Sequence, residues 1–445
     1  MKKYVLSIAA IMSIAFNLQA QSNFQSIAPL SGVPNYLTTQ SLLLSTTNQD
    51  VISLGGTSFS KNLFGQNATL VKQNILSKTI AFHNEYIFSN PTNGNQYKSY
   101  FESGVENTNG NVAIVGNVDN DNFLLFAEIN SANGSAIQAK KVELFGVTNI
   151  SRVTPIKLLF DANTGNYICV YKHYIEHHVP NTNPSVIFIW NKFGVMILDP
   201  NFNVIDCKTY TKSRPPSSPI FSDELLFPHD ALIFNNSISG FTELAIVGST
   251  QLASLNPLTP HNLDHTAAFL ARIVLPMAPM SPLPNTLAFN VYPYHYNNTA
   301  IEASTANTFT HFTSTTSGFY IGGLYETQTA FDPLLLHVDD NGTLLNSYGI
   351  TSPTPISISN FQYDFITSIH HDGLNNNLIF TGGIQERALL SQPFVPFDRY
   401  NSLYLRPTLS IFNLSSNAIS RSRYDAINTF PNKSWYSHSV YDQNL

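Results

Sequence analysis

Charged side chains are scarce in this chain of 445 residues. Asp, Glu, Lys and Arg together make up 11% of it, against an average of about 25% in soluble proteins. Asn, Ser, Thr and Gln must therefore cover most of the surface, which is typical of extracellular β-proteins. The net charge is a modest −6, and no cluster of basic residues occurs. Nucleic acid is therefore not expected as a partner.

Long apolar runs are missing too, apart from one at the N-terminus. Lys2 and Lys3 precede an apolar stretch over residues 5–16, and Leu18-Gln19-Ala20 ends in the small residue of a cleavage site. This order is typical of a secretory signal peptide, and the run is short for a retained membrane anchor. No cysteine follows the site to carry a lipid, and no later segment approaches transmembrane length. We expect an exported protein, secreted or at the outer cell surface, whose mature chain begins at Gln21.

Helical periodicity is missing beyond the signal peptide, while an apolar strand that ends in glycine recurs along the chain. Its clearest setting is residues 318–350, where such a strand precedes a polar loop, a second apolar run at 334–338, an Asn341-Gly342 turn and a returning strand. Asn-Gly between apolar runs predicts a tight hairpin turn with positive φ at both central residues. The glycine-ended strand occurs at residues 51–56, 112–116, 244–248, 320–323 and 378–383, with a glycine-free copy at 167–171.

Each copy lies in the same context, with a strand and a turn before it and two further strands after a loop. Four antiparallel strands that run up and down form the blade of a β-propeller. A lone sheet of this kind could not bury both faces, whereas blades stacked around an axis can. We therefore predict an all-β fold, a β-propeller of four-stranded antiparallel blades. Its six complete repeats cover residues 36–88, 98–147, 150–212, 226–295, 305–351 and 360–427.

The predicted organisation is a signal peptide (1–20), an N-terminal segment (21–35), the propeller (36–427) and a final segment (428–445). Within the final segment, Trp435 to Asp442 resembles the first strand of a partial seventh unit. Residues 24–34 could supply the last strand of that blade, but its two middle strands would be missing. Either the sequence is a fragment of a longer chain, which we favour, or this segment packs against a six-bladed ring as an extra edge.

The order of a Gly-Gly strand, a loop, an apolar strand, an Asp/Asn-Gly turn and a final strand resembles the β-propeller repeat proteins secreted by Bacteroidetes-type bacteria. The resemblance covers nearly the whole mature chain and is specific for the fold. It implies a bacterial protein of a kind in which a C-terminal sorting domain for type IX secretion often follows the propeller. No such domain is visible after residue 427, and the resemblance implies no catalytic residues.

Cysteine is nearly absent, since Cys169 and Cys207 are the only two. An oxidising compartment would permit a disulfide between them. The repeat places Cys169 in the second strand of its blade and Cys207 in the fourth. Strands two apart lie about 9.5 Å from each other, which is beyond the reach of a disulfide. We predict two free, mostly buried thiols.

Catalytic motifs are absent or lie in unsuitable contexts. No G-x-S-x-G elbow, P-loop or dinucleotide fingerprint occurs. His173, Glu176 and His177 spell the H-x-x-E-H of some zinc peptidases, but the flanking residues alternate like a strand. On a strand the two histidines lie about 13 Å apart and could not share a zinc. We interpret the region as an extended hairpin, 170–198, whose tip, with His178, could bind a surface metal adventitiously.

Two further polar runs contain residue types that bind metals. Asp119 and Asp121 lie in an oxygen-rich loop of the kind that Ca²⁺ prefers, although the EF-hand pattern is absent, so they are weak candidates for calcium. His370-His371-Asp372-Gly373 is interpreted as a turn, in which the Asp-Gly pair is ordinary turn chemistry and the histidines are turn or surface residues. No other cofactor is expected.

The face of the propeller that carries the long loops is the predicted binding surface. In propellers the first strand of each blade lines the axis, and the connections between second and third strands share one face. Loops on a rigid scaffold are where binding usually occurs. The long connections are 57–67, 117–122, 172–191, 249–266, 325–332 and 385–402. The candidate residues on them, aromatic and charged groups that suit a protein or glycan, are Tyr325, Glu326, Arg387, Arg399, Tyr400, His261 and His265.

These features predict a binding or interaction module at the bacterial surface, more a binder than an enzyme, whose partner is a protein or a carbohydrate. Two alternatives stay open. One is a propeller-fold hydrolase or lyase with acids and histidines near the axis, and the other is a structural segment of a longer adhesin.

Overall fold

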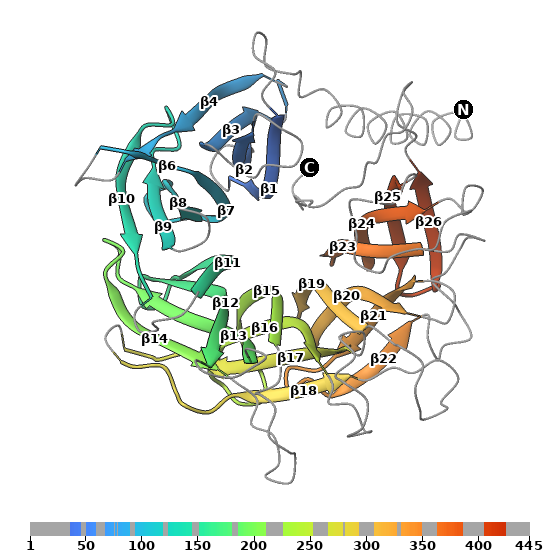
Figure 1. Cartoon of the computed structure of the whole chain (residues 1–445). Helices are drawn as coiled ribbons and strands as arrows, with labels where there is room; N and C mark the ends of the chain where they lie inside the picture. Colours follow the sequence, from blue (N-terminus) through green and yellow to red (C-terminus); the bar gives the residue numbers. More distant parts are fainter. Residues whose placement is uncertain are drawn as a thin grey trace.

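The computed structural model describes sixteen segments of the chain, and its strands form six four-stranded antiparallel blades around an axis (Figure 1). Blades 5 and 6 join into one sheet only through a single parallel pair, Phe331 with Tyr363. No helix occurs in the described residues, and within them nothing is long and apolar enough to cross a membrane as a helix. The predicted all-β propeller is confirmed. The described residues are 36–45, 50–58, 67–74, 76–77, 79–89, 94–118, 123–144, 151–179, 186–210, 226–251, 266–278, 281–292, 307–326, 331–348, 363–385 and 405–423.

The strands follow the predicted repeat closely. Blade 1 consists of β1 (Tyr36–Leu44), β2 (Asp50–Ser58), β3 (Ala68–Asn74) and β4 (Ile80–Tyr86), and the short β5 (Phe88–Ser89) and β6 (Gln96–Tyr97) follow it. Blade 2 consists of β7 (Ser99–Glu106), β8 (Val112–Val118), β9 (Phe123–Ile129) and β10 (Ala136–Val142), and blade 3 of β11 (Ser151–Asp161), β12 (Asn166–Val179), β13 (Val186–Leu198) and β14 (Val204–Tyr210). Blade 4 consists of β15 (Leu226–Asn235), β16 (Thr242–Gln251), β17 (Thr266–Val274) and β18 (Ala288–Tyr292). Blade 5 consists of β19 (Asn307–Thr315), β20 (Gly318–Glu326), β21 (Phe331–Val338) and β22 (Leu344–Tyr348), and blade 6 of β23 (Tyr363–Asp372), β24 (Asn377–Gln385), β25 (Leu405–Asn413) and β26 (Ala418–Arg423).

The recurring glycine is explained by a β-bulge at the same place in every first strand. In five blades the residue paired with the start of the bulge is a glycine of the second strand. A Cβ on Gly116 would lie 2.0 Å from the carbonyl oxygen of Tyr100, and one on Gly323 would lie 1.9 Å from that of Thr308. The backbone of the bulge occupies the space that a side chain would need.

Blade 3 accommodates its bulge without a glycine in the second strand. There the bulge begins at Pro155, which pairs with Tyr171 rather than a glycine. The glycine of this blade is in the third strand, where Gly194 pairs with Tyr171. A Cβ on Gly194 would lie 2.0 Å from the Cζ atom of the Tyr171 ring. The tyrosine ring therefore lies over a glycine, an arrangement known to support glycines in sheets.

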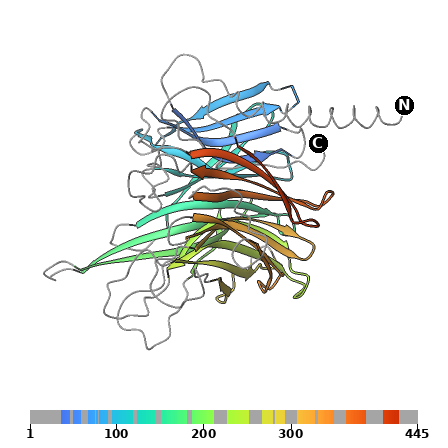
Figure 2. The ribbon, with the colours of Figure 1, turned by 90° about the vertical axis from the view of Figure 1, so that its right-hand side faces the viewer.

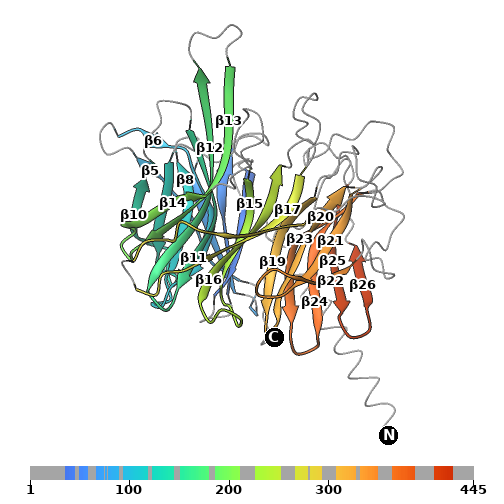
Figure 3. The same ribbon diagram turned by 90° about the horizontal axis from the view of Figure 1, so that it is seen from below.

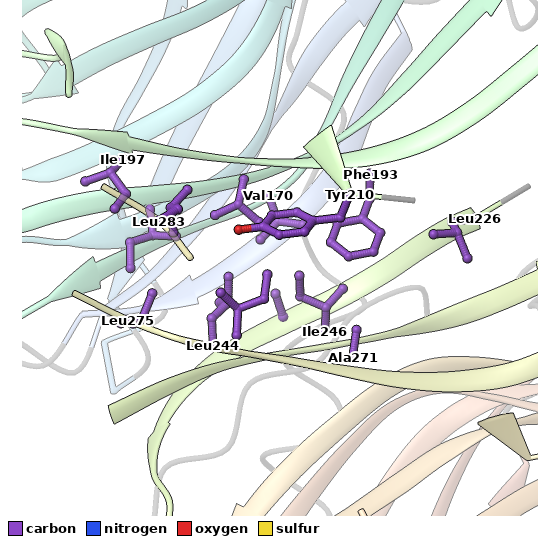
Figure 4. Close-up of a cluster of buried hydrophobic side chains, with 14 of the residues drawn as sticks. Val170, Phe193, Ile197, Tyr210, Leu226, Leu244, Ile246, Ala271, Leu275 and Leu283 are labelled. Carbon is purple, nitrogen blue, oxygen red and sulfur yellow. The ribbon is translucent and has the colours of Figure 1, made fainter. Parts of the chain in front are cut away.

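Apolar side chains fill the junction between each described pair of neighbouring blades. At the junction of blades 3 and 4, Val170 and Phe193 meet Leu244 and Ile246, and all are at most 3% exposed (Figure 4). Phe193 also stacks on Phe269 of blade 4 with 6.3 Å between ring centroids. Full burial of such a side chain contributes about 1.5–3 kcal/mol. Successive junctions of this kind hold the ring together.

A tyrosine at the end of the fourth strand connects several blades to the next one. The hydroxyl of Tyr86 donates to the carbonyl oxygen of Gly134 at 2.7 Å, and that of Tyr210 donates to Pro284 at 2.9 Å. Tyr292 donates to Gly342 in the same way. Each acceptor lies on or near the connection between the third and fourth strands of the following blade. The repeat of an outer-edge tyrosine is therefore a feature of the packing between blades.

Two expectations about local structure have different outcomes. Cys169 and Cys207 both pair with Met196, so β13 lies between their strands, and both thiols are free as predicted. Burial raises the pKa of the Cys169 thiol above its ordinary value. The expected turn with two positive φ angles at Asn341-Gly342 is wrong. Only Gly342 has a positive φ (79°), and the register shift beside His337 makes this a type I turn with a glycine bulge.

Candidate functional site

The β12–β13 hairpin rises beyond the other blades on the side where second and third strands connect (Figures 2 and 3). The strand containing His173 to Val179 confirms the extended hairpin and excludes the helical zinc-peptidase arrangement. β12 pairs with β11 as far as Ile175, and β13 pairs with β14 only from Phe193 onward. Beyond these points the two strands pair only with each other, which leaves unpaired edges among the described strands. The unpaired N–H and C=O groups of such a ribbon can pair with a strand of another chain.

Of the predicted loop residues, two belong to the part of the chain that the structure describes. Tyr325 and Glu326 end β20, where they pair with Asp332 and Phe331, so their backbone is at the loop face as expected. Their proposed contact with a ligand stays a prediction. The candidates outside the described residues are Arg387, Arg399, Tyr400, His261, His265 and the calcium candidates Asp119 and Asp121.

Below the hairpin, the junction of blades 3 and 4 carries polar side chains above its apolar cluster. Strand alternation turns Asn191 to the same side as Phe193, and Thr250 to the same side as Ile246. Asn191 is 7% exposed and Thr250 is fully buried. No described residue provides a hydrogen-bond partner for Asn191 Oδ1 or Thr250 Oγ1. Buried polar atoms of this kind are uncommon and call for water or a ligand.

A cation and an aromatic ring belong to the same region. Lys172 pairs with Phe193 and so lies beside Asn191 on the same face of blade 3. Burial lowers the pKa of Lys172, and its Nζ atom lies 5.0 Å from the centroid of the Phe227 ring of blade 4. We call Lys172, Asn191, Phe227 and Thr250 the junction site. An amide oxygen, a hydroxyl, an ammonium and an aromatic ring can bind the hydroxyl or carboxylate groups of a sugar or a peptide.

A second polar group lines the axis. The residue that follows the bulge in each first strand is serine in three blades and ionisable in three consecutive blades. In blades 1 to 6 these residues are Ser41, Ser103, Lys157, Asp230, His311 and Ser368. Figure 1 shows that the first strands surround the axis, as predicted. Asp230 and His311 are the acid and the histidine among these axial residues.

Asp230 connects its two ionisable neighbours. Its Oδ1 atom lies 2.9 Å from Lys157 Nζ, and its Oδ2 atom lies 3.3 Å from His311 Nε2. The Asp230 side chain is 7% exposed, against 32% for Lys157. Burial by itself would raise the pKa of Asp230, but Lys157, His311 and the backbone N–H of Ala231 together outweigh it, and the pKa lies below its usual value. Pairing is what makes a buried carboxylate tolerable.

His311 is held as a neutral ring. The backbone N–H of Ile369 donates to its Nδ1 atom at 3.2 Å, so this nitrogen carries no proton. Burial lowers the pKa of His311 to about 4 and outweighs the opposing effect of Asp230. The single ring proton is then on Nε2 and is donated to Asp230. A general base needs a nitrogen that faces a substrate, and both nitrogens of His311 are engaged within the protein.

The predicted turn at His370 and His371 is wrong, because both residues lie in β23. The ring of His370 lies 5.7 Å from that of His311, and its Nε2 atom lies 3.1 Å from Ser368 Oγ. Burial lowers the pKa of His371, whose ring lies 5.9 Å from that of Tyr320. Within the described ranges, no group of three His, Cys, Asp or Glu residues could hold a metal.

The concavity at the other end of the blade 3–blade 4 junction is small. It is bordered by Asp161, Ile168, Ile197, Leu275 and Ser281, and its interior space is about 10 Å³. That is room for a single water molecule. This concavity therefore offers no space for a small-molecule substrate.

Sequence reasoning missed both the junction site and the axial group. Alignment of the six first strands on the repeat would have revealed the axial position, because the residue there is serine in three blades and ionisable in the other three. The junction site has no such signal. Asn191 and Thr250 are ordinary surface residues by type, and only the packing of two blades buries them.

Comparison with known proteins adds no family. No family model matches the sequence, and no curated protein matches it. Solved structures that it resembles include the WD40 domain of SCAP from fission yeast, with 9% identity, 88% of each chain covered and a TM-score of 0.30. Another is a putative 6-phosphogluconolactonase from Bacteroides uniformis, with 12% identity, 84% of this chain and 95% of that chain covered and a TM-score of 0.37. A protein from Lactobacillus plantarum has 11% identity, coverages of 83% and 94% and a TM-score of 0.32.

Proposed function

We propose that the protein is a secreted or cell-surface binding module of a bacterium and that its ligand is a protein or a carbohydrate. The ligand contacts the face that carries the second-to-third-strand connections. The observation that supports this proposal is the pair of buried polar atoms without described partners at that face, Asn191 Oδ1 and Thr250 Oγ1. A hydroxyl or amide group of a ligand would satisfy either atom.

Two further observations agree with a binding role at this face. The β12–β13 hairpin extends beyond the blades, and past Ile175 and before Phe193 its two strands pair only with each other among the described strands. A projecting ribbon with unpaired edges suits a macromolecular partner. The axial group, by contrast, is satisfied internally, since both nitrogens of His311 are engaged. A hydrolase or lyase with an axial histidine base gains no support from this arrangement.

The proposal is tested by binding measurements on the mature chain, residues 21–445. Immobilised polysaccharides and outer-surface protein extracts are offered to the wild type and to the variants Asn191→Ala and Thr250→Val. Both variants are expected to weaken capture while leaving the fold intact by circular dichroism. Thr343→Val is a matched control, because this exposed threonine lies in the β21–β22 turn, away from the junction site. Unchanged capture by both junction variants would contradict the proposal.

A further inference from the structure

The ring of described blades has an interval between blade 6 and blade 1. Each of the five junctions from blade 1 to blade 6 contains a buried apolar cluster. Among the described residues no such cluster joins blade 6 to blade 1, and no described strand stands between them (Figure 1). Both blades therefore present to this interval a face that no described blade covers.

The face of blade 1 toward the interval is nevertheless buried in part. Ile52 and Leu54 of β2 pack on blade 2, so the alternate residue Val51 points the other way, and pairing puts Thr69 of β3 on that side too. Val51 is 7% exposed and Thr69 is 3% exposed. Both residues are therefore buried although no described blade lies on that side.

The face of blade 6 toward the interval is less covered. Ile379 and Ile411 are paired across β24 and β25, on the side opposite to Phe380 and Phe412, which face blade 5. Ile411 is 40% exposed. An apolar pair of this kind, on a face bordered by the interval, is suited to contact with another strand.

The sequence contains a segment with the pattern of a first strand. Tyr436-Ser437-His438 repeats the aromatic, hydroxyl and histidine order of Phe309-Thr310-His311, which forms the bulge of β19. In His438-Ser439-Val440 a small residue and a valine follow the axial position, as Gly104 and Val105 follow Ser103 after the bulge of β7. Asp442 then falls four residues after the axial position, where Asp161 and Asp372 accept hydrogen bonds from the turn in blades 3 and 6.

We propose that residues 434–442 of this same chain form a first strand in the interval, against blade 6, with His438 at the axial position. Two junctions define the contact. The N–H of Leu158 donates to Ser103 Oγ at 3.1 Å, and the N–H of Ile369 donates to His311 Nδ1 at 3.2 Å. In each case the residue after the axial position binds the axial side chain of the preceding blade. By this rule the N–H of Ser439 donates to Ser368.

The same register assigns the faces of the new strand. Gly104 faces the preceding blade, because a Cβ added there would lie 2.7 Å from Leu54 of blade 1. Ser439 takes this position, so Ser439 and Tyr441 face blade 6. Val440 takes the position of Val105, which packs toward the following blade, and so it faces the apolar side of blade 1. The segment thereby contacts both faces that border the interval.

A pair of engineered cysteines tests the register. In Ser368→Cys with Ser439→Cys, the two residues are neighbours across adjacent strands, within the range that a disulfide spans. The matched control combines Ser368→Cys with Ser434→Cys, which lies five residues away, about 16 Å along the strand. Both double variants are oxidised mildly, and the linked peptides are identified by mass spectrometry without reduction. This assignment separates the new link from Cys169 and Cys207.

A disulfide between positions 368 and 439 in the monomer, and none with position 434, is the expected result. No link, or equal links to both positions, overturns the proposal. A link that joins two chains also overturns it, because a second copy would then fill the interval. Deletion of residues 434–445 is expected to lower the midpoint of thermal unfolding, and an unchanged midpoint contradicts the proposal. If the deletion variant fails to fold, the cysteine pair still decides.

Discussion

Replacement of Thr250 by valine tests the junction site without knowledge of the ligand. Thr250 is fully buried in β16, and its Oγ1 atom has no hydrogen-bond partner among the described residues. A buried hydroxyl without a partner destabilises a protein by about 1–3 kcal/mol. Valine has nearly the same shape and suits a strand. At position 250 it would lie on the same side of β16 as Ile246, which belongs to the apolar cluster of the junction. The variant should therefore be more stable than the wild type by about 1–3 kcal/mol, while it binds the ligand less well.

The measurement is equilibrium unfolding in guanidinium chloride, followed by circular dichroism at unchanged slope. Thr310→Val is the matched control, because Thr310 Oγ1 donates to the carbonyl oxygen of Ile366 at 2.6 Å. That variant loses a hydrogen bond and should be less stable by about 1 kcal/mol. If Thr250→Val is destabilised like the control, the Thr250 hydroxyl has a partner within the protein. The argument for a ligand at the junction site would then be refuted.

Three further predictions concern the axis and the bulge. Asp230→Asn leaves Lys157 without its carboxylate and should lower the free energy of unfolding. Loss of one partner of a buried ion pair costs about 3–5 kcal/mol, and we expect the lower value because Lys157 is one-third exposed. A change below the error of a urea titration would contradict this. Because the pKa of His311 is lowered from 6.5 to about 4, the unfolded chain binds this proton first, so stability should fall as the pH drops through that window. In His311→Gln the amide group can accept from the Ile369 N–H and donate to Asp230, but it does not titrate. The midpoint of thermal unfolding should therefore change less between those pH values than in the wild type, and an unaltered pH profile would count against the assignment. Gly323→Ala forces a Cβ against the Thr308 carbonyl and should cost about 1–3 kcal/mol or more, while Gly373→Ala in an open turn should be nearly neutral; equal effects of the two in thermal melts would argue against the bulge explanation.

The fold could be predicted because its signals are local and repeated. An apolar strand that ends in glycine recurs once per blade, and each copy has its turn at the same distance. The bulge behind that glycine was not predictable from one copy, since it depends on pairing with the first strand. The turn at Asn341-Gly342 was assigned to the wrong type because two residues cannot show whether the flanking strand shifts its register.

The candidate sites were predictable only in part. The loop face follows from the topology, so Tyr325 and Glu326 were correctly placed at its edge, although their role is untested. The junction site was not found, because it depends on which faces of blades 3 and 4 meet. The Asp372-Gly373 pair predicts a turn that includes His370, yet β23 continues through both histidines before the turn. A turn signal shows where a strand ends, but it does not show that the residues just before it still belong to the strand.

The axial position shows where the fold restricts side chains and where it leaves them free. The bulge requires a glycine or an equivalent accommodation opposite it, as Gly116 and Gly194 show. The residue after the bulge has no such restriction and is serine in some blades and ionisable in others. Where it is ionisable, a neighbouring blade supplies the partner, as Asp230 does for Lys157 and His311. Because the axis in this way satisfies its own charges, the unsatisfied atoms at the loop face, Asn191 Oδ1 and Thr250 Oγ1, are the better guide to where a ligand binds.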